Sequence, residues 1–117
     1  MFQIQNTRIQ LTRGDSAAFT VEILRKTADG QTEPYVMAED DTLTLTVRRS
    51  PRDPHPTLTL QSAGSPVFAL RPQDTKSMCG RYIYDIELRT AAGDVYTILG
   101  PGAALPTEME ILPEVTV

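Results

Sequence analysis

The chain has 117 residues, a net charge of −4 and a pI near 4.9, and its length is that of a single domain, residues 1–117, that can bury enough surface to fold unaided. The acidic charge argues against nucleic acid as a partner, because binding to phosphate backbones needs clustered Lys and Arg to displace counterions. The one cysteine, Cys79, cannot close an intrachain disulfide, and with the one histidine, His55, it leaves too few ligands for a structural zinc site.

The first third of the chain reads as strands separated by turns. Residues 4–11 form a modest extended segment that ends at the turn residues 13–15 (Arg-Gly-Asp). Residues 16–24 alternate apolar and polar side chains, which is typical of a half-buried strand. The side chains predicted to face the core are Ala17, Phe19, Val21 and Ile23.

The dipeptide Asp29-Gly30 predicts a hairpin turn, because both residues tolerate positive φ. Residues 35–37 (Tyr-Val-Met) are the predicted return strand. Pro34 cannot donate to a ladder, so this strand is expected to lie at a sheet edge or to begin after the proline.

The middle of the chain predicts a strand, an exposed loop and a second hairpin. Residues 42–49 alternate cleanly, while the prolines in residues 50–56 exclude a helix or a central strand and predict an exposed loop. Residues 57–61 and 66–70 flank a run of turn residues, Ser62-Ala63-Gly64-Ser65, and are expected to pair with each other.

The last third contains the clearest strand. Residues 71–79 allow one helical turn, capped by Asp74 or Thr75. Residues 80–88 are predicted to form a strand that is joined by a turn at residues 92–94 to a return strand at residues 95–99. Residues 105–117 give one or two further extended pieces split by a proline. The side chains of 80–88 predicted to face the core are Tyr82, Tyr84, Ile86 and Leu88.

These elements amount to about eight short strands and no substantial helix, with turn signals every 8 to 12 residues. The pattern predicts an all-β, antiparallel β-sandwich. We expect an immunoglobulin-like sandwich with a jelly roll as the alternative, since sequence patterns do not fix strand order. Tyr82 follows a turn and begins a strand, which predicts a tyrosine corner, in which its hydroxyl bonds to the backbone just upstream.

Residues that could carry catalysis are few. His55 lies between two prolines in a loop, with no nucleophile motif beside it. Cys79 is interpreted as a small buried apolar residue, which is the commoner role of an unpaired cysteine. We therefore predict no enzyme, no catalytic, cofactor-binding or metal-binding residue, and no cofactor.

Candidate binding motifs have simpler structural interpretations. Residues 39–41 (Glu-Asp-Asp) lack the spacing of a calcium loop and are interpreted as a solvated turn. The arginines at 48, 49 and 52 form too short a cluster for a binding stripe, and residues 13–15 are interpreted as a turn. A carbohydrate platform would need exposed aromatic residues, whereas Tyr82, Tyr84 and Tyr96 fit strand patterns that bury at least some of them.

Several stretches together carry a resemblance to a known family. They are residues 9–17 (IQLTRGDSA), 41–48 (DTLTLTVR), 74–75 with 80–88 (DT and GRYIYDIEL), and 97–98 with 113–116 (TI and PEVT). In order and spacing they resemble small β-sandwich proteins of phage and prophage tails in Gram-positive bacteria, and are similar to the N-terminal domain of upper baseplate proteins. The resemblance supplies no catalytic or metal-binding residue.

The resemblance implies a virion structural protein of the tail or baseplate, which assembles with itself, as a homo-oligomer, or with other phage tail proteins. Residues 2–4 and 109–117 are the segments expected to extend a sheet by strand addition. The alternative is a ligand-binding module for carbohydrate or cell-wall polymer. Residues 1–10 lack the features of a signal peptide and no apolar run could span a membrane, so we expect synthesis in the bacterial cytoplasm, no membrane partner, and assembly into a virion.

Overall fold

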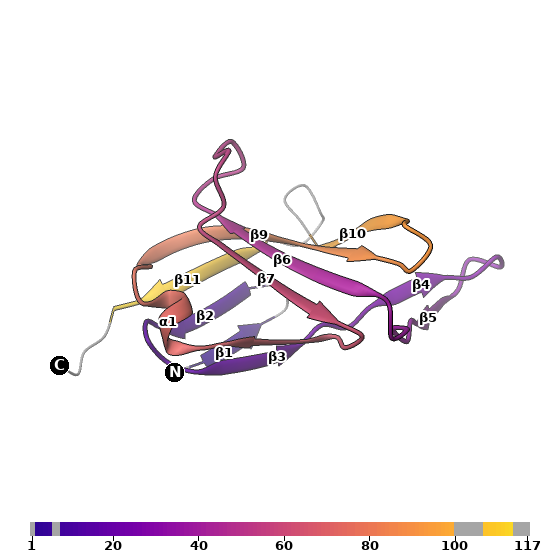
Figure 1. Cartoon of the computed structure of the whole chain (residues 1–117), viewed down its shortest axis with the longest axis horizontal. Helices are drawn as coiled ribbons and strands as arrows, with labels where there is room; N and C mark the ends of the chain where they lie inside the picture. The colour runs from indigo at the N-terminus through magenta and orange to yellow at the C-terminus, as the bar shows by residue number, and fades with distance from the viewer. Residues whose placement is uncertain (1, 6–7, 100–106, 114–117) are drawn as a thin grey trace.

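The computed structural model describes residues 2–5, 8–99 and 107–113 and confirms the all-β prediction (Figure 1). This part of the chain contains no helix suited to crossing a membrane. The elements are β1 Phe2–Gln5, β2 Arg8–Thr12, β3 Ala17–Thr20, β4 Leu24–Lys26, β5 Thr32–Pro34, β6 Thr42–Arg48, β7 Leu58–Ala63, β8 Val67–Leu70, α1 Pro72–Thr75, β9 Gly80–Arg89, β10 Val95–Leu99 and β11 Glu108–Leu112.

The main sheet is organised around β9. Its strand order is β1-β2-β11-β9-β6-β7, and β10 also pairs with β9. One edge of β9 pairs with β6 along most of its length, while the other edge pairs first with β11 and then with β10. The change of partner falls at Tyr84, whose amide donates to the carbonyl of Thr107 at 3.1 Å. Except for the parallel pair of β11 and β2, every pairing in this sheet is antiparallel.

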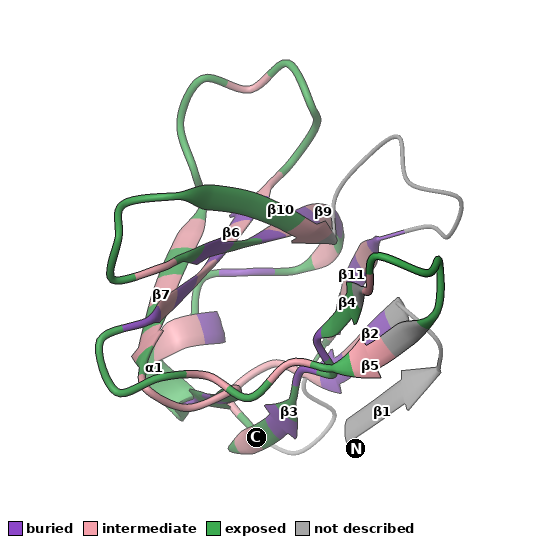
Figure 2. Ribbon diagram, turned by 90° about the vertical axis from the view of Figure 1, so that its right-hand side faces the viewer, coloured by how far each residue is buried: buried purple, intermediate pink, exposed green. Residues whose placement is uncertain are grey.

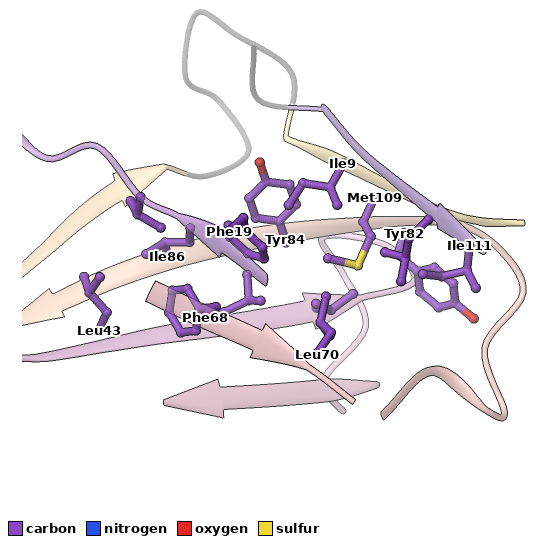
Figure 3. Close-up of a cluster of buried hydrophobic side chains, with 14 of the residues drawn as sticks. Ile9, Phe19, Leu43, Phe68, Leu70, Tyr82, Tyr84, Ile86, Met109 and Ile111 are labelled. Atoms are coloured by element: carbon purple, nitrogen blue, oxygen red, sulfur yellow. The ribbon is translucent and has the colours of Figure 1, made fainter. Parts of the chain in front are cut away.

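A smaller layer, the antiparallel pair of β3 and β8, packs across the core from this sheet (Figure 3). Phe19 and Phe68 join the two strands, with ring centroids 5.7 Å apart and planes inclined by 37°. The side chains predicted to face the core in β9 are all buried there. The buried cluster comprises Ile9, Leu11, Phe19, Val21, Ile23, Leu43, Leu45, Val47, Phe68, Leu70, Met78, Tyr82, Tyr84, Ile86, Leu88, Met109 and Ile111.

Part of the strand order resembles that of the predicted immunoglobulin-like sandwich. In variable-type immunoglobulin sheets the order is G-F-C-C′, with strands B and E paired in the facing sheet. Here the order β11-β9-β6-β7 and the pair of β3 and β8 follow the same connectivity. The sandwich type itself stays a prediction.

The predicted tyrosine corner is present. The hydroxyl of buried Tyr82 accepts a hydrogen bond from the backbone amide of Cys79 at 3.1 Å. The guanidinium of Arg49 lies 4.4 Å from the centre of the same ring, within the range of a cation–π contact. Tyr82 therefore fixes the entry of the chain into β9.

We expect Tyr82→Phe to lower the free energy of unfolding by about 1 kcal/mol, the usual net contribution of one hydrogen bond. The ring and its contact with Arg49 are retained, so the change isolates the hydroxyl. Urea unfolding followed by circular dichroism measures the difference, with Tyr96→Phe on the surface as the control. An unchanged denaturation midpoint in Tyr82→Phe would show that the bond to Cys79 contributes nothing.

The first hairpin differs from its prediction. Its return strand is β5, Thr32–Pro34, rather than residues 35–37. The amide of Thr27 donates to the carbonyl of Gln31 at 2.7 Å, so pairing resumes directly after the Asp29-Gly30 turn. Hydrogen-bonded and non-bonded pairs alternate along the ladder from this bond, so the pair of Pro34 and Leu24 is a non-bonded one, in which no amide donor is required. The proline is therefore accommodated inside the strand.

The predicted second hairpin is wrong, although both of its strands exist. β7 pairs with β6, and β8 pairs with β3 in the other layer. Between β7 and β8 the amide of Gly64, at φ 70°, donates to the carbonyl of Asp41 at 2.8 Å. The turn residues thus carry the chain from one layer to the other, where Phe68 and Leu70 are buried in the core opposite β3.

The predictions for residues 4–11 and 16–24 need correction too. The first is two paired strands, β1 and β2, whose connection at residues 6–7 lies outside the described residues. The segment 16–24 ends as a strand at Thr20. The next residue, Val21, donates its amide to the carbonyl of Pro66 at 2.7 Å, but proline has no amide with which to continue the ladder. The structure therefore describes eleven strands rather than about eight.

Candidate functional site

His55 and Cys79 lie in different loops and both are exposed. His55 is in the loop after β6, as predicted, where its amide donates to the carboxylate of Asp53 at 3.0 Å. Cys79 corrects our expectation of burial: Met78 takes the buried position before β9, which leaves the next side chain facing outward. Among the described residues, no group of three His, Cys, Asp or Glu side chains could hold a metal ion.

The acidic turn at residues 39–41 is structural rather than solvated at its last residue. Asp41 is only 2% exposed, and its carboxylate accepts hydrogen bonds from the hydroxyl of Tyr35 and from the amides of Ala38 at 2.9 Å and Ala91 at 3.3 Å. The bond from Tyr35, followed by the Ala38 amide, holds the pKa of Asp41 below its usual value. The same bond raises the pKa of Tyr35. Asp41 therefore ties Tyr35 to the loop after β9.

We expect Asp41→Asn to lower the urea midpoint at pH 7, because the charged carboxylate is the better acceptor for these three donors. A carboxyl whose pKa is lowered by folding stabilises the fold above its unfolded pKa, near 3.8, and loses that contribution as the pH falls through its folded pKa. The difference between wild type and variant should therefore shrink between pH 5 and pH 2. Equal differences at pH 7 and pH 2 would contradict this account, and exposed Asp40→Asn is the control.

The basic cluster and the Arg-Gly-Asp tripeptide also have structural roles. Arg48 lies 3.9 Å from the carboxylate of Asp85 and donates from Nε to the carbonyl of Asp53 at 3.1 Å. Arg49 stacks on Tyr82 as described above. Gly14 has φ 84°, and its amide donates to Oγ1 of buried Thr75 at 2.9 Å. Arg48, Arg49 and Gly14 therefore each make a structural contact.

A hollow of about 430 Å³ lies at one end of the molecule, between the ribbon of β4 and β5 and the hairpin of β9 and β10. The residues of β4 and β10 are mostly exposed (Figure 2). Its described lining consists of Ile23, Leu24, Arg25, Tyr35, Leu88, Thr90, Tyr96, Thr97 and Ile98. We call these residues, together with Val36 and Val95, the open end.

No protein-family model, curated protein or solved structure matches this chain. The chemistry of the open end is therefore interpreted from its own residues. It is a concave surface that joins aromatic, aliphatic and hydroxyl groups, which is the usual composition of a binding site. Its described lining offers aromatic rings, aliphatic side chains and threonine hydroxyls, which can hold a ligand by packing and hydrogen bonding.

Exposed apolar side chains gather at the open end. Tyr96 is 53% exposed and Val95 is 47% exposed, both on β10, while Leu24 and Val36 are exposed on and after the β4–β5 ribbon. Leu24 and Tyr96 line the hollow itself, whereas Val95 points to the opposite face of β10. Arg25 places its guanidinium 5.9 Å from the ring centre of Tyr35 and pairs with Glu33 at 2.5 Å. Arg25 therefore has an ion-pair partner within the ribbon.

The tyrosines divide into two groups. Tyr82 and Tyr84 are core residues, and burial raises the pKa of Tyr84 to about 12. Tyr35 and Tyr96 line the hollow instead. The alternation of side chains in residues 95–99 predicted a strand with two different faces. It could not show that the inner face, on which Tyr96 lies beside Leu88, remains open to solvent at this end of the molecule.

Proposed function

We propose that the protein is a non-enzymatic structural component of a phage or prophage tail, which acts through assembly with itself or with other tail proteins. The observation that supports this function is the exposed apolar surface of β10. Val95 and Tyr96 belong to a strand that, among the described strands, pairs only with β9. Exposed edge strands with apolar side chains recruit further strands, and isolated soluble proteins usually protect them with charge, proline or a covering segment.

We place the site of assembly at β10 rather than at the chain ends. β11 pairs with β2 on one edge and β9 on the other, and Met109 and Ile111 are buried, so Glu108–Leu112 has no free edge for strand addition. Residues 114–117 lie outside the described residues. β1 is the last strand of the main sheet at that side, as strand addition requires. β10 has the same property and also carries described exposed apolar side chains.

The test is the presence of the chain in phage particles. Particles produced from a strain that carries the gene would be purified and analysed by mass spectrometry, alongside particles from a strain in which the gene is deleted. We expect the chain in wild-type particles and defective or absent tails after deletion, restored by the wild-type gene. Intact, infective particles that lack the chain would refute the proposed function.

A second candidate function, binding of carbohydrate or cell-wall polymer, is favoured by Tyr35 and Tyr96 in the lining of the hollow. Aromatic rings with nearby hydroxyl groups, here Thr90 and Thr97, can hold a sugar ring. Calorimetric titration with purified bacterial cell-wall polysaccharide tests it. Heat of binding that Tyr96→Ala abolishes would support this candidate, and no heat with the wild type would refute it.

A further inference from the structure

We infer that β10 pairs antiparallel with β10 of a second copy of the chain, about a two-fold axis at Tyr96. This inference rests on the proposed function, assembly with itself, and names the surface and register. The groups that carry it are the backbone amides and carbonyls on the outer edge of β10.

The hairpin turn fixes which groups face that edge. The amide of Gly93 donates to the carbonyl of Thr90, and the amide of Thr90 donates to the carbonyl of Asp94, both at 2.9 Å. Gly93 has φ 93°, so this is a three-residue turn closed by a hydrogen-bonded pair of Thr90 and Asp94. Hydrogen-bonded and non-bonded pairs alternate from such a closing pair along an antiparallel ladder.

The register then gives the orientation of each residue. Val95 lies opposite Arg89 and Thr97 opposite Glu87, both in non-bonded pairs, while Tyr96 lies opposite Leu88 in a bonded pair. The bond from the Tyr84 amide to Thr107 agrees with this assignment, because the backbone amides of alternate residues of β9, such as Tyr84 and Leu88, point to the same edge of the strand. The amides and carbonyls of Val95 and Thr97 therefore point away from β9, and they have no hydrogen-bond partner within residues 2–5, 8–99 and 107–113.

These outward groups are self-complementary. Val95 and Thr97 flank Tyr96 symmetrically, so a two-fold axis at Tyr96 places Val95 of each copy opposite Thr97 of the other. Both outward residues then exchange hydrogen bonds with their counterparts, and the two Tyr96 residues meet in a non-bonded pair, the closest cross-strand position. A two-fold joint of this kind is the commonest way for a soluble chain to oligomerise.

The side chains suit this joint as well as the backbone. Tyr96 shares the inner face with buried Leu88, so the two rings meet over the two hollows and cover apolar surface that is exposed in one copy. On the outer face, the cross-strand neighbours run from Arg89 through Val95 of one copy to Thr97 and Glu87 of the other. An arginine at one end is thus matched by a glutamate at the other, and like charges do not face each other. This match favours a second copy over an unrelated strand.

The oligomeric state tests the inference. Light scattering after size exclusion, over a range of concentrations, should give the wild type a mass twice 12.9 kDa. Tyr96→Lys adds a charge to the edge and Thr97→Pro removes an outward amide without removing a bond to β9, so both should give the monomer mass. Val67→Lys, on β8, should remain dimeric. Circular dichroism confirms that each variant is folded.

Cross-linking tests the register. In a Cys79→Ser background, Tyr96→Cys should form an intermolecular disulfide on mild oxidation, because the paired Cα atoms lie at about 4.5 Å, within disulfide range. Thr97→Cys should cross-link far less, because its opposite residue is Val95.

A monomer at every concentration, a dimer that Tyr96→Lys leaves intact, or equal cross-linking by both cysteine variants would overturn the inference. A monomeric chain that still enters particles would refute the pairing and leave the proposed function standing. A dimeric chain that is absent from particles would refute the proposed function and leave the pairing standing.

Discussion

Ile86→Ala is expected to lower the free energy of unfolding by about 2 to 5 kcal/mol, the cost of removing a buried branched side chain and leaving a cavity. Ile86 is 1% exposed at the centre of the main sheet, opposite Leu45 of β6 on one side and Leu99 of β10 on the other. Its neighbours belong to several strands, so the cavity cannot close by a movement of one loop. Urea unfolding measures the change.

Ile83→Ala is the matched control, since it makes the same chemical change in the same strand on the opposite, partly exposed face. Its effect should be smaller, because less apolar area is removed from the interior. If Ile86→Ala cost less than about 1 kcal/mol, or less than Ile83→Ala, the inner face of β9 would have been assigned incorrectly.

Phe68→Ala should cost about 3 to 5 kcal/mol, the range for a buried aromatic side chain. Phe68 supplies the ring that meets Phe19, and these two residues lie directly opposite each other in the pair of β3 and β8. This pair is only two strands wide, so it depends on burial against the main sheet more than on its own ladder. We therefore expect loss of the Phe19 contact and a looser facing layer as well as lower stability.

Val67→Ala is the control for Phe68→Ala, because Val67 is the preceding residue of β8 and points outward. Urea unfolding gives the stability of both variants, and amide hydrogen exchange reports on β3 and β8 separately from β9. Protection of β3 should fall in Phe68→Ala and stay unchanged in Val67→Ala. Unchanged protection in both would mean that the layer is held by other contacts.

Strands with a clean alternation were predictable from sequence. Residues 42–49 and 80–88 became β6 and β9 almost without change, because each has one face buried and the period of two is imposed by that burial. The tyrosine corner followed from local order alone, a turn and then Tyr82. These predictions depend on neighbours in the chain, which a sequence displays directly.

Features that depend on distant parts of the chain were not predictable in the same way. The turn at residues 62–65 has the residues of a hairpin, and only the position of β3 makes it a crossing between layers. Asp41 is buried because Tyr35 and Ala91 converge on it from separate hairpins. The strand patterns predicted burial of at least some of Tyr82, Tyr84 and Tyr96 without showing which, and Tyr96 is the one that is exposed and lines the hollow.

The parallel pairing of β2 with β11 sets the order in which the protein can be completed on the ribosome. Nε2 of Gln10 donates to Oε1 of Glu110 at 2.8 Å across a separation of 100 residues. At about 5–20 residues per second, synthesis of that interval takes roughly 5 to 20 s. β2 lacks the neighbour that later lies beside it throughout this time, and the first half of β9 lacks the same neighbour from its own synthesis until β11 is made. The hairpin of β1 and β2 can form early, but the sheet closes only when β11 emerges.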